Sequence, residues 1–331
     1  MKNKKTAVFF FSVAVLCAVL GVGCSKAAAQ ERPPAQEAVR PSAQTGAPAV
    51  YMTDKITPEG LLAVYEALGL QANGNVAVKI STGEPGNTHY LSPSLIKNLV
   101  QKVNGTIVES NTAYGGRRAS AAAHYQVARD HGFTAIAPVV ILDERADISI
   151  PVTGGKHLRE DIVGARFKDF NFHIVLSHFK GHQMGGFGGA LKNMSIGYAS
   201  SAGKSWIHSA GKRKTGISGP QNDFLESMAE AAKAVADANK GRMLYINVMN
   251  KLSVDCDCNG SPAAPTMADI GILASLDPVA LDQACVDLIY KARDGKDVIA
   301  RIESRNGLLT INHAEAIGLG SKTYRLIRID G

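Results

Sequence analysis

The chain has 331 residues, of which 45% are hydrophobic and 20% are charged, and its formal net charge is +7. This composition excludes a disordered protein, a collagen-like fibre and a small disulfide-rich scaffold. The length suits one large domain or two small ones, and the positive charge raises the question of a nucleic acid or another anionic partner.

The first 23 residues are organised like a signal for export. Three lysines among the first five residues precede an apolar run over 7–22. This run is short for a transmembrane helix, which needs about 20 apolar residues, but it is typical of a secretory signal. Cys24 then resembles the lipidated first residue of a bacterial lipoprotein. We therefore expect an exported, periplasmic or cell-envelope protein with a lipid anchor in the membrane; cleavage near 27–29 without an anchor is the alternative.

Residues 24–50 are rich in Ala, Pro, Gln and Glu and hold almost no large apolar side chains. Such a segment cannot bury enough surface to offset the entropy lost on ordering, so we expect a disordered tether. Loss of the signal removes three lysines and leaves +4, of which the tether carries +1 and the body 51–331 only +3. No basic stretch interleaved with aromatic residues is present, so we expect no nucleic-acid partner.

The body alternates between helix-like and strand-like segments. Proline follows the potential helix caps Thr57, Ser92 and Asp277, as is typical of helix starts. We expect helices over 57–68, 92–103, 119–131 and 224–239 and from 277 onward, and strands over 75–81, 106–110, 134–142, 170–177, 242–249 and 268–275. This alternation predicts a single α/β domain with a mostly parallel sheet, and the continuous apolar strands predict helices on both faces. The stretch 148–168 alternates less cleanly and is interpreted as a hairpin.

Polar side chains collect in the loops that follow the expected strands. In open α/β sheets, ligands bind in the crevice at the carboxyl ends of the strands. Such residues follow five of the strands, with Arg117 and Arg118 after 106–110 and Asp277 after 268–275. We therefore expect four or five of these loops to face one site, although ordinary solvated loops are also polar.

The densest polar segment is 177–194, which holds two histidines, two lysines and a run of glycines. Imidazole titrates near neutral pH and binds metals, so His178 and His182 are candidate metal ligands or acid–base groups. Lys180, between them, is a candidate catalytic residue that would hold an anionic oxygen. Glycine N–H groups before a helix start near 190 could form an anion-binding nest. The candidate ligand-binding residues are Gly185, Gly186, Gly188, Gly189, Lys192, Asn193, Arg117 and Arg118. Ordinary surface polarity is the alternative, and the segment lacks a Walker A ending.

The cysteines limit the cofactor. Of the five, only Cys256, Cys258 and Cys285 belong to the body. A four-iron cluster held by cysteine alone needs four thiolates, so the body cannot bind one unaided. Cys285 shares a helical face with two leucines and is expected in the core. Cys256 and Cys258 alternate with Asp255 and Asp257, so this segment could supply two thiolates and two carboxylates to a metal, or the cysteines could form a redox pair. The alternative is oxidation after export, to a Cys-x-Cys disulfide or by pairing with another thiol.

Together these residues resemble the bacterial and archaeal family called domain of unknown function 362, whose members are often labelled as uncharacterised iron–sulfur-centre proteins. The resemblance covers about residues 75–290 and rests on the blocks 178–182, 186–193, 202–208 and 269–282. It implies a site formed by His178, Lys180, His182, Lys192 and Asn193. Many members carry a four-cysteine, ferredoxin-like insertion after the third block. This chain holds no cysteine there, which suggests a separate electron-transfer protein as a partner.

The sequence therefore predicts an exported α/β protein that binds a metal, with a transition metal as the suggested cofactor, or a small anionic ligand. Its chemistry is expected to be redox-related if the protein is an enzyme. The alternative is a non-catalytic lipoprotein that captures a solute or binds a membrane partner.

Overall fold

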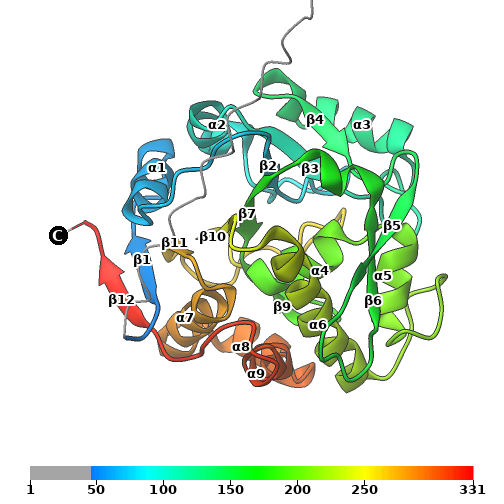
Figure 1. The fold of residues 1–331 in the computed structure, drawn as a ribbon. Helices are drawn as coiled ribbons and strands as arrows, with labels where there is room; N and C mark the ends of the chain where they lie inside the picture. Colours follow the sequence, from blue (N-terminus) through cyan, green and yellow to red (C-terminus); the bar gives the residue numbers. More distant parts are fainter. Residues whose placement is uncertain (1–45, 331) are drawn as a thin grey trace, which may run out of the picture. The chain divides into compact units, whose positions relative to one another are not determined.

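The computed structural model describes residues 46–330. The expected signal, the lipidation candidate Cys24 and nearly all of the expected tether lie outside the described residues. The centre of the described part is an eight-stranded sheet with the order β12-β1-β11-β10-β7-β2-β3-β4 (Figure 1). Its strands are β1 (Ala49–Thr53), β2 (Val76–Lys79), β3 (Thr106–Glu109), β4 (Val139–Ile141), β7 (Phe172–His178), β10 (Met243–Met249), β11 (Gly271–Ser275) and β12 (Arg325–Arg328). The predicted α/β fold is confirmed.

Five neighbouring strands, from β10 to β4, run parallel to one another. β11 is antiparallel to both of its neighbours, β10 and β1. A parallel neighbour needs a crossover connection, usually a helix, and the segment between β10 and β11 contains no helix. The carboxyl end of β11 therefore lies at the opposite edge from that of β10. The expectation that Asp277 joins the other loops is wrong.

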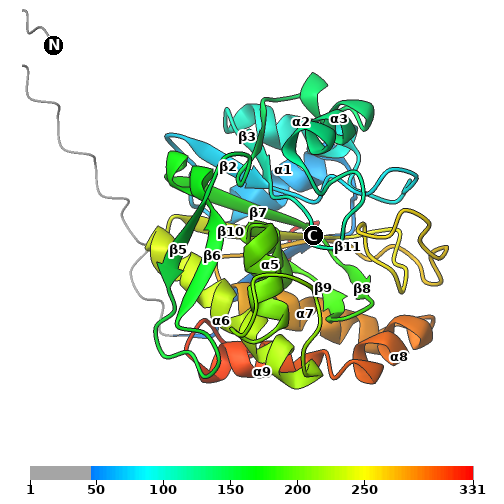
Figure 2. The ribbon, with the colours of Figure 1, turned by 90° about the vertical axis from the view of Figure 1, so that its right-hand side faces the viewer.

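Helices cover both faces of the sheet, as predicted (Figure 2). The face with α1 (Pro58–Ala67) and α2 (Pro93–Lys102) encloses one hydrophobic cluster, and α3 (Ala121–Asp130) lies beside β4. The opposite face is covered by α4 (Ala190–Tyr198), α5 (Ser201–His208), α6 (Gln221–Asn239), α7 (Pro278–Lys291), α8 (Lys296–Ser304) and α9 (Leu308–Ala316), which enclose the larger cluster. This larger cluster includes Cys285, in agreement with its predicted place in the core.

The helix starts follow the sequence closely. Thr57, Ser92 and Asp277 accept hydrogen bonds from backbone N–H groups in the first turn of α1, α2 and α7, and a proline follows each of them. The expected strand over 134–142 is shorter than predicted, because its first part forms the 3₁₀ helix η1 (Phe133–Ala135) and the strand starts after Pro138.

Two small antiparallel pairs lie outside the main sheet. β5 (Asp147–Pro151) pairs with β6 (Glu160–Gly164), which confirms the predicted hairpin, and the 3₁₀ helix η2 (Ala165–Asp169) follows it. β8 (Lys180–His182) pairs with β9 (Gly186–Gly188), so the polar segment after β7 forms a hairpin rather than an open loop.

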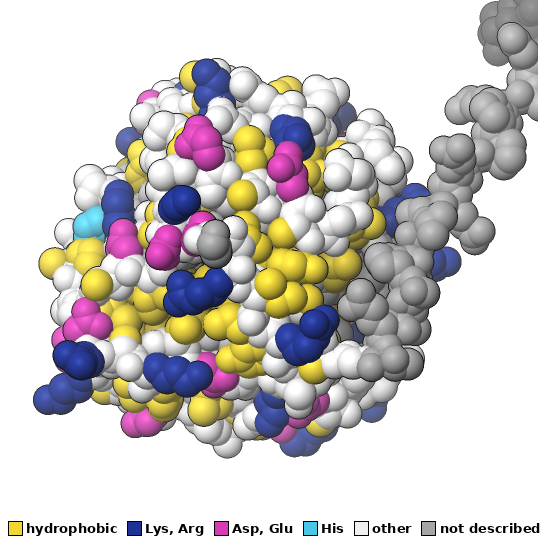
Figure 3. Space-filling view, turned by 90° about the vertical axis from the view of Figure 1, so that its left-hand side faces the viewer, with side chains coloured by type: hydrophobic (Ala, Val, Ile, Leu, Met, Phe, Trp, Pro, Cys, Tyr) yellow, Lys and Arg dark blue, Asp and Glu magenta, His cyan; other side chains and the backbone are white. Residues whose placement is uncertain are grey.

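At one side of the main sheet, β12 forms the edge and β1 lies next to it, and neither strand was predicted. β1 begins at Ala49, two residues before the expected start of the domain. On the side of the molecule where β1 and β12 lie, basic and acidic side chains are interspersed among hydrophobic ones rather than gathered by sign (Figure 3).

None of the helices within residues 46–330 combines the length and the apolar character that crossing a membrane requires.

Candidate functional site

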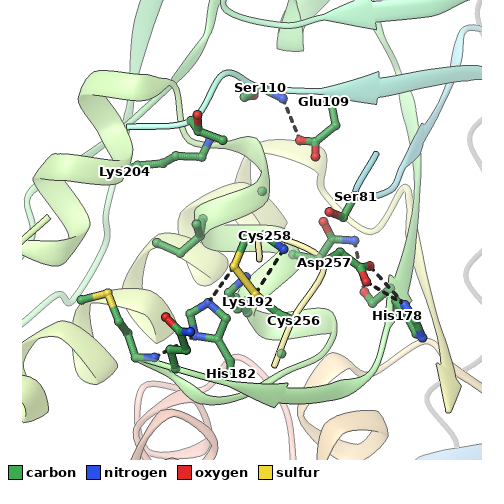
Figure 4. A pocket seen from close by; sticks show the side chains of 18 of the residues that line it. Ser81, Glu109, Ser110, His178, His182, Lys192, Lys204, Cys256, Asp257 and Cys258 are labelled. Atoms are coloured by element: carbon green, nitrogen blue, oxygen red, sulfur yellow. Dashed lines mark hydrogen bonds and ion pairs between the residues drawn. A yellow bond between two sulfur atoms is a disulfide. The ribbon is translucent and has the colours of Figure 1, made fainter. Parts of the chain in front are cut away.

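A pocket of about 340 Å³ lies at the carboxyl ends of β2, β3 and β7 and beside the loop that follows β10. Residues of α4 and α5 complete its walls (Figure 4). Four of the five loops expected to share a crevice therefore contribute to or border one cavity. Five basic side chains and two carboxylates line it: Lys79, Arg118, Lys180, Lys192 and Lys204 with Glu109 and Asp257.

One wall is an ion-pair network between β2 and β3. Lys79 Nζ lies 3.1 Å from Glu109 Oε2, and Arg118 Nη1 lies 3.3 Å from Glu109 Oε1. Arg118 Nε also donates to Glu84 Oε1 over 2.8 Å. Burial alone would raise the pKa of Glu109, but Lys79 and Arg118 outweigh it and lower this pKa to about 2. Glu109 is therefore ionised at neutral pH.

A second network surrounds Asp257. Its carboxylate accepts from Lys180 Nζ at 2.7 Å and from His178 Nδ1 at 3.1 Å. These two partners hold the pKa of Asp257 below its usual range, against the effect of burial. His178 Nε2 lies 2.7 Å from the Asn250 carbonyl oxygen. Both ring nitrogens of His178 thus point at oxygen atoms of the protein, so neither is directed toward a metal in the open space of the pocket. The candidate role of His178 as a metal ligand does not fit this geometry.

The hairpin after β7 positions His182. Gly181 N donates to the Ser253 carbonyl over 2.9 Å, and a Cβ at residue 181 would lie only 2.6 Å from Val254 Cα. Glycine therefore allows β8 to run against the loop after β10. Because side chains alternate along extended backbone, His178, Lys180 and His182 can all line the pocket. The sequence predicted that these residues lie in a loop, whereas His178 ends β7 and Lys180 and His182 belong to β8.

His182 is held in one tautomer. Its Nδ1 accepts from the N–H groups of Met184 and Gly185, over 3.2 and 2.8 Å. The neutral ring therefore carries its hydrogen on Nε2, which lies 3.8 Å from Cys258 Sγ. Burial, followed by the charges of nearby basic groups such as Lys192, lowers the pKa of His182 well below its usual value. The imidazole is therefore neutral at physiological pH.

Cys256 and Cys258 form a disulfide with each other at the edge of the pocket. A Cys-x-Cys disulfide was the alternative to metal binding by these two cysteines in the sequence analysis. The two sulfurs and a His182 nitrogen lie close enough together to hold a metal ion. However, a disulfide offers no thiolate, and a metal on His182 Nε2 would have to displace the hydrogen that its tautomer places there. In the oxidised state these residues do not fit a metal ion.

Lys192 and Lys204 reach the pocket from α4 and α5. Among the described residues, no carboxylate lies within ion-pair distance of either ammonium group, although Lys204 Nζ donates to the Ala199 carbonyl over 2.6 Å. Burial lowers the pKa of each lysine to about 8. Both lysines are therefore mostly charged at neutral pH, and the carboxylates that act on them, among them Glu109, do so from beyond ion-pair distance.

The predicted glycine nest does not bind an external anion. The first N–H groups of α4, those of Ala190 and Leu191, donate to the carboxylate of Asp282 over 2.8 and 2.9 Å. Gly188 and Gly189 border the pocket, whereas Gly185 and Gly186 do not. The prediction of an anion at this helix start is wrong, because α7 supplies its own carboxylate there.

Two other candidate ligand-binding residues also differ from expectation. Arg117 is exposed, lies within 3.8 Å of Asp130 and does not line the pocket, unlike its neighbour Arg118. Asn193 lines the pocket, but its side-chain amide joins β2 to β7 by donating to the Lys79 carbonyl and to Ser177 Oγ. Arg117 is therefore removed from the site, and Asn193 holds the two strand ends together.

Among the charged residues of the pocket, Lys79, Glu109 and Lys204 were not among the predicted site residues, and Asp257 was considered only as a metal ligand beside the cysteines. Lys79 and Glu109 had a detectable signal, since each is a charged residue in a strand expected to be buried on both faces. Lys204 lay in a block that carried the family resemblance, and Asp257 lay between the two cysteines. The sequence showed no reason for Lys204 to face the pocket, whereas Asp257 belongs to one of the loops that were expected to share the site.

Comparisons with known proteins identify a family. No curated protein matches the chain. A lactate racemase apoprotein from Thermoanaerobacterium thermosaccharolyticum is similar, with 13% identity and a TM-score of 0.37 over 60% of this chain and 50% of that one. A structural-genomics target from Thermotoga maritima is similar, with 13% identity and a TM-score of 0.40 over 78% of this chain and 58% of that one. The chain thus spans only about half the length of these two structures. The family model described as domain of unknown function (DUF362) matches residues 76–287, and the chain belongs to this family.

Proposed function

We propose that this chain is an exported, lipid-anchored protein whose pocket binds a small anionic ligand. The observation that carries the proposal is the charge of the pocket lining, where five basic side chains face two carboxylates. Glu84, behind Arg118, adds a third carboxylate and still leaves the basic groups in excess.

The excess positive charge favours an anion over a metal ion as the ligand. A buried ammonium group without a direct ion-pair partner is costly, and a bound carboxylate or phosphate would reduce that cost. A divalent cation would instead be repelled by the same groups. Lys192 is only partly buried and borders the open space of the pocket, so it is the basic group best placed to contact the ligand.

Calorimetric titration of the purified chain tests this proposal, with inorganic phosphate and succinate as probes. We expect binding of at least one probe and a loss of affinity of about tenfold for Lys192→Gln, the loss of one close charge interaction. Lys97→Gln is the matched control, because Lys97 lies on the exposed side of α2. Equal affinities for the two variants would contradict the proposal.

A second candidate function, metal binding, rests on the proximity of His182, Cys256 and Cys258. It requires that an electron-transfer partner or another reductant first opens the disulfide. Anaerobic loading with zinc and elemental analysis would test it. Stoichiometric metal on the reduced chain and none on the oxidised chain is the expected result for this function, and its absence from both would exclude it.

A further inference from the structure

We propose that the Cys256–Cys258 disulfide oxidises a small anionic thiol bound in the pocket. This inference rests on the proposed anion-binding function and names the ligand class: a thiol that also carries a carboxylate or phosphate group. The reactive sulfurs, a histidine and the excess of basic groups all line the same cavity.

The position of this disulfide argues for a chemical role. It joins residues only two positions apart, so it constrains very little of the unfolded chain. The stabilisation from a cross-link grows with the length of the loop that it closes, and this loop is close to the minimum. The disulfide also borders the pocket instead of tying two elements together. A disulfide at this position would add little to the stability of the fold, so its place beside the pocket favours a redox role.

The surroundings of the two sulfurs distinguish their roles. Cys256 is 7% exposed, while Cys258 is more accessible. The backbone N–H of Cys258 donates to Cys256 Sγ over 3.3 Å, and a hydrogen bond of this kind stabilises a thiolate. The substrate thiolate therefore attacks Cys258 Sγ, and the electron pair of the broken S–S bond goes to Cys256 Sγ.

A second thiolate completes the reaction. It attacks the substrate sulfur of the mixed disulfide, which releases the small-molecule disulfide and the Cys258 thiolate. In total, two thiols lose two protons and two electrons, and the protein disulfide accepts the two electrons. The step is stoichiometric, with one chain oxidising two thiols.

His182 favours the second step. Its tautomer directs Nε2–H toward Cys258 Sγ, 3.8 Å away, so it can donate to the thiolate that leaves. Lys192 supplies the binding charge nearby, and its charge adds to burial in lowering the pKa of His182. An anionic group of the substrate held by Lys192 would thus lie beside the disulfide that the thiol attacks.

The experiment mixes the oxidised full chain with thioglycolate, 2-mercaptoethanol or cysteamine, which are anionic, neutral and cationic. Each rate is divided by the rate of the same thiol with 2-hydroxyethyl disulfide, so that differences in intrinsic reactivity cancel. Alkylation and mass spectrometry follow the peptide that contains Cys256 and Cys258. We expect the normalised rate for thioglycolate to exceed that for 2-mercaptoethanol by about tenfold, as for one close charge pair. Equal normalised rates would overturn the proposal.

Two variants separate the roles of the side chains. Lys192→Gln should remove most of the preference for thioglycolate, whereas the control Lys97→Gln should keep it. His182→Asn can retain the acceptor for the Met184 and Gly185 N–H groups but loses the donor to sulfur, so the mixed disulfide should accumulate on Cys258. A mixed disulfide on Cys256 instead would overturn the assignment of the two sulfurs.

The outcomes also separate this inference from the function on which it rests. If phosphate or succinate binds but the disulfide reacts with none of the thiols, thiol oxidation is excluded and anion binding stands. If neither probe binds and the thiol rates show no charge preference, both proposals fail.

Discussion

The positive charge of the pocket depends on pH, because Lys192 loses its proton in an accessible pH range. Its pKa is lowered to about 8 by burial, and so is that of Lys204. A neutral amine cannot balance a carboxylate, so the affinity for an anion should fall as these groups lose their protons. The bound anion itself raises the lysine pKa, which shifts the fall upward.

We therefore predict that succinate binds more weakly as the pH rises from about 7 to about 9, a range over which succinate keeps its charge. Lys192→Gln should flatten this dependence, and Lys97→Gln should not. Calorimetric titration across the pH range measures both. An affinity of the unmodified chain that does not change with pH would contradict the assignment of the lysines as the binding groups.

Glu109 should stabilise the fold at neutral pH. Its pKa is lowered from an ordinary value of 4.5 to about 2 by Lys79 and Arg118, against burial. This contribution is fully present above pH 4.5 and is lost as the pH falls toward 2. Glu109→Gln leaves two buried cations without their counter-charge, so we predict a loss of about 3 kcal/mol in the free energy of unfolding at neutral pH.

Urea unfolding of both proteins at several pH values measures this difference. The gap between them should narrow as the pH falls from 4.5 toward 2, because the Glu109 carboxyl of the unfolded chain is protonated in this range while that of the folded chain still resists protonation. A gap that stays constant over this range would show that the ion pairs with Lys79 and Arg118 do not cause it.

At the residue scale, only part of the site could be predicted from the sequence. The spacing of two between His178, Lys180 and His182 was visible, but only their extended backbone shows that they face one side. Arg117 and Arg118 are adjacent and chemically alike, so sequence could not tell which one turns inward. That choice depends on Glu84 and Glu109, which other segments supply.

At the element scale, the start of α4 depends on a contact across the fold. Asp282, in α7, accepts from the N–H groups of Ala190 and Leu191 and from the Asn247 side chain. A Cβ on Gly189 would lie 2.4 Å from an oxygen of the same carboxylate, which explains the glycine at this helix start. The carboxylate thus fixes the helix that carries Lys192.

We predict that Asp282→Ala lowers the free energy of unfolding by about 2 kcal/mol, the upper range for loss of a helix cap. The affinity for succinate should fall as well, because the first turn of α4 loses its anchor. Chemical denaturation and titration measure the two effects. A variant with unchanged stability would show that Asp282 does not hold the helix.

The local helix signals were reliable because each depends on a few neighbouring residues. Thr57, Ser92 and Asp277 cap the helices that the sequence assigned to them. The direction of β11 was not accessible in the same way. It depends on whether the long connection after β10 crosses the sheet, and that connection contains no helical pattern to decide the question.

At the scale of the whole molecule, the proposed anchor would place the pocket at the cell envelope. If Cys24 is lipidated, Cys24→Ser should move the protein from the membrane fraction to the soluble exported fraction, since the anchor is lost. Cell fractionation and the mass of the mature chain test this prediction. Membrane association that survives the substitution would contradict a lipid anchor at Cys24.

The central claim is that the pocket binds an anion through its basic side chains, and a titration tests it directly. Titration of the oxidised full chain with succinate and phosphate, at low and at high salt, should show binding of at least one probe. That binding should weaken with salt and in Lys192→Gln but not in Lys97→Gln. Absence of binding to both probes, or binding that neither salt nor Lys192→Gln changes, would contradict the account.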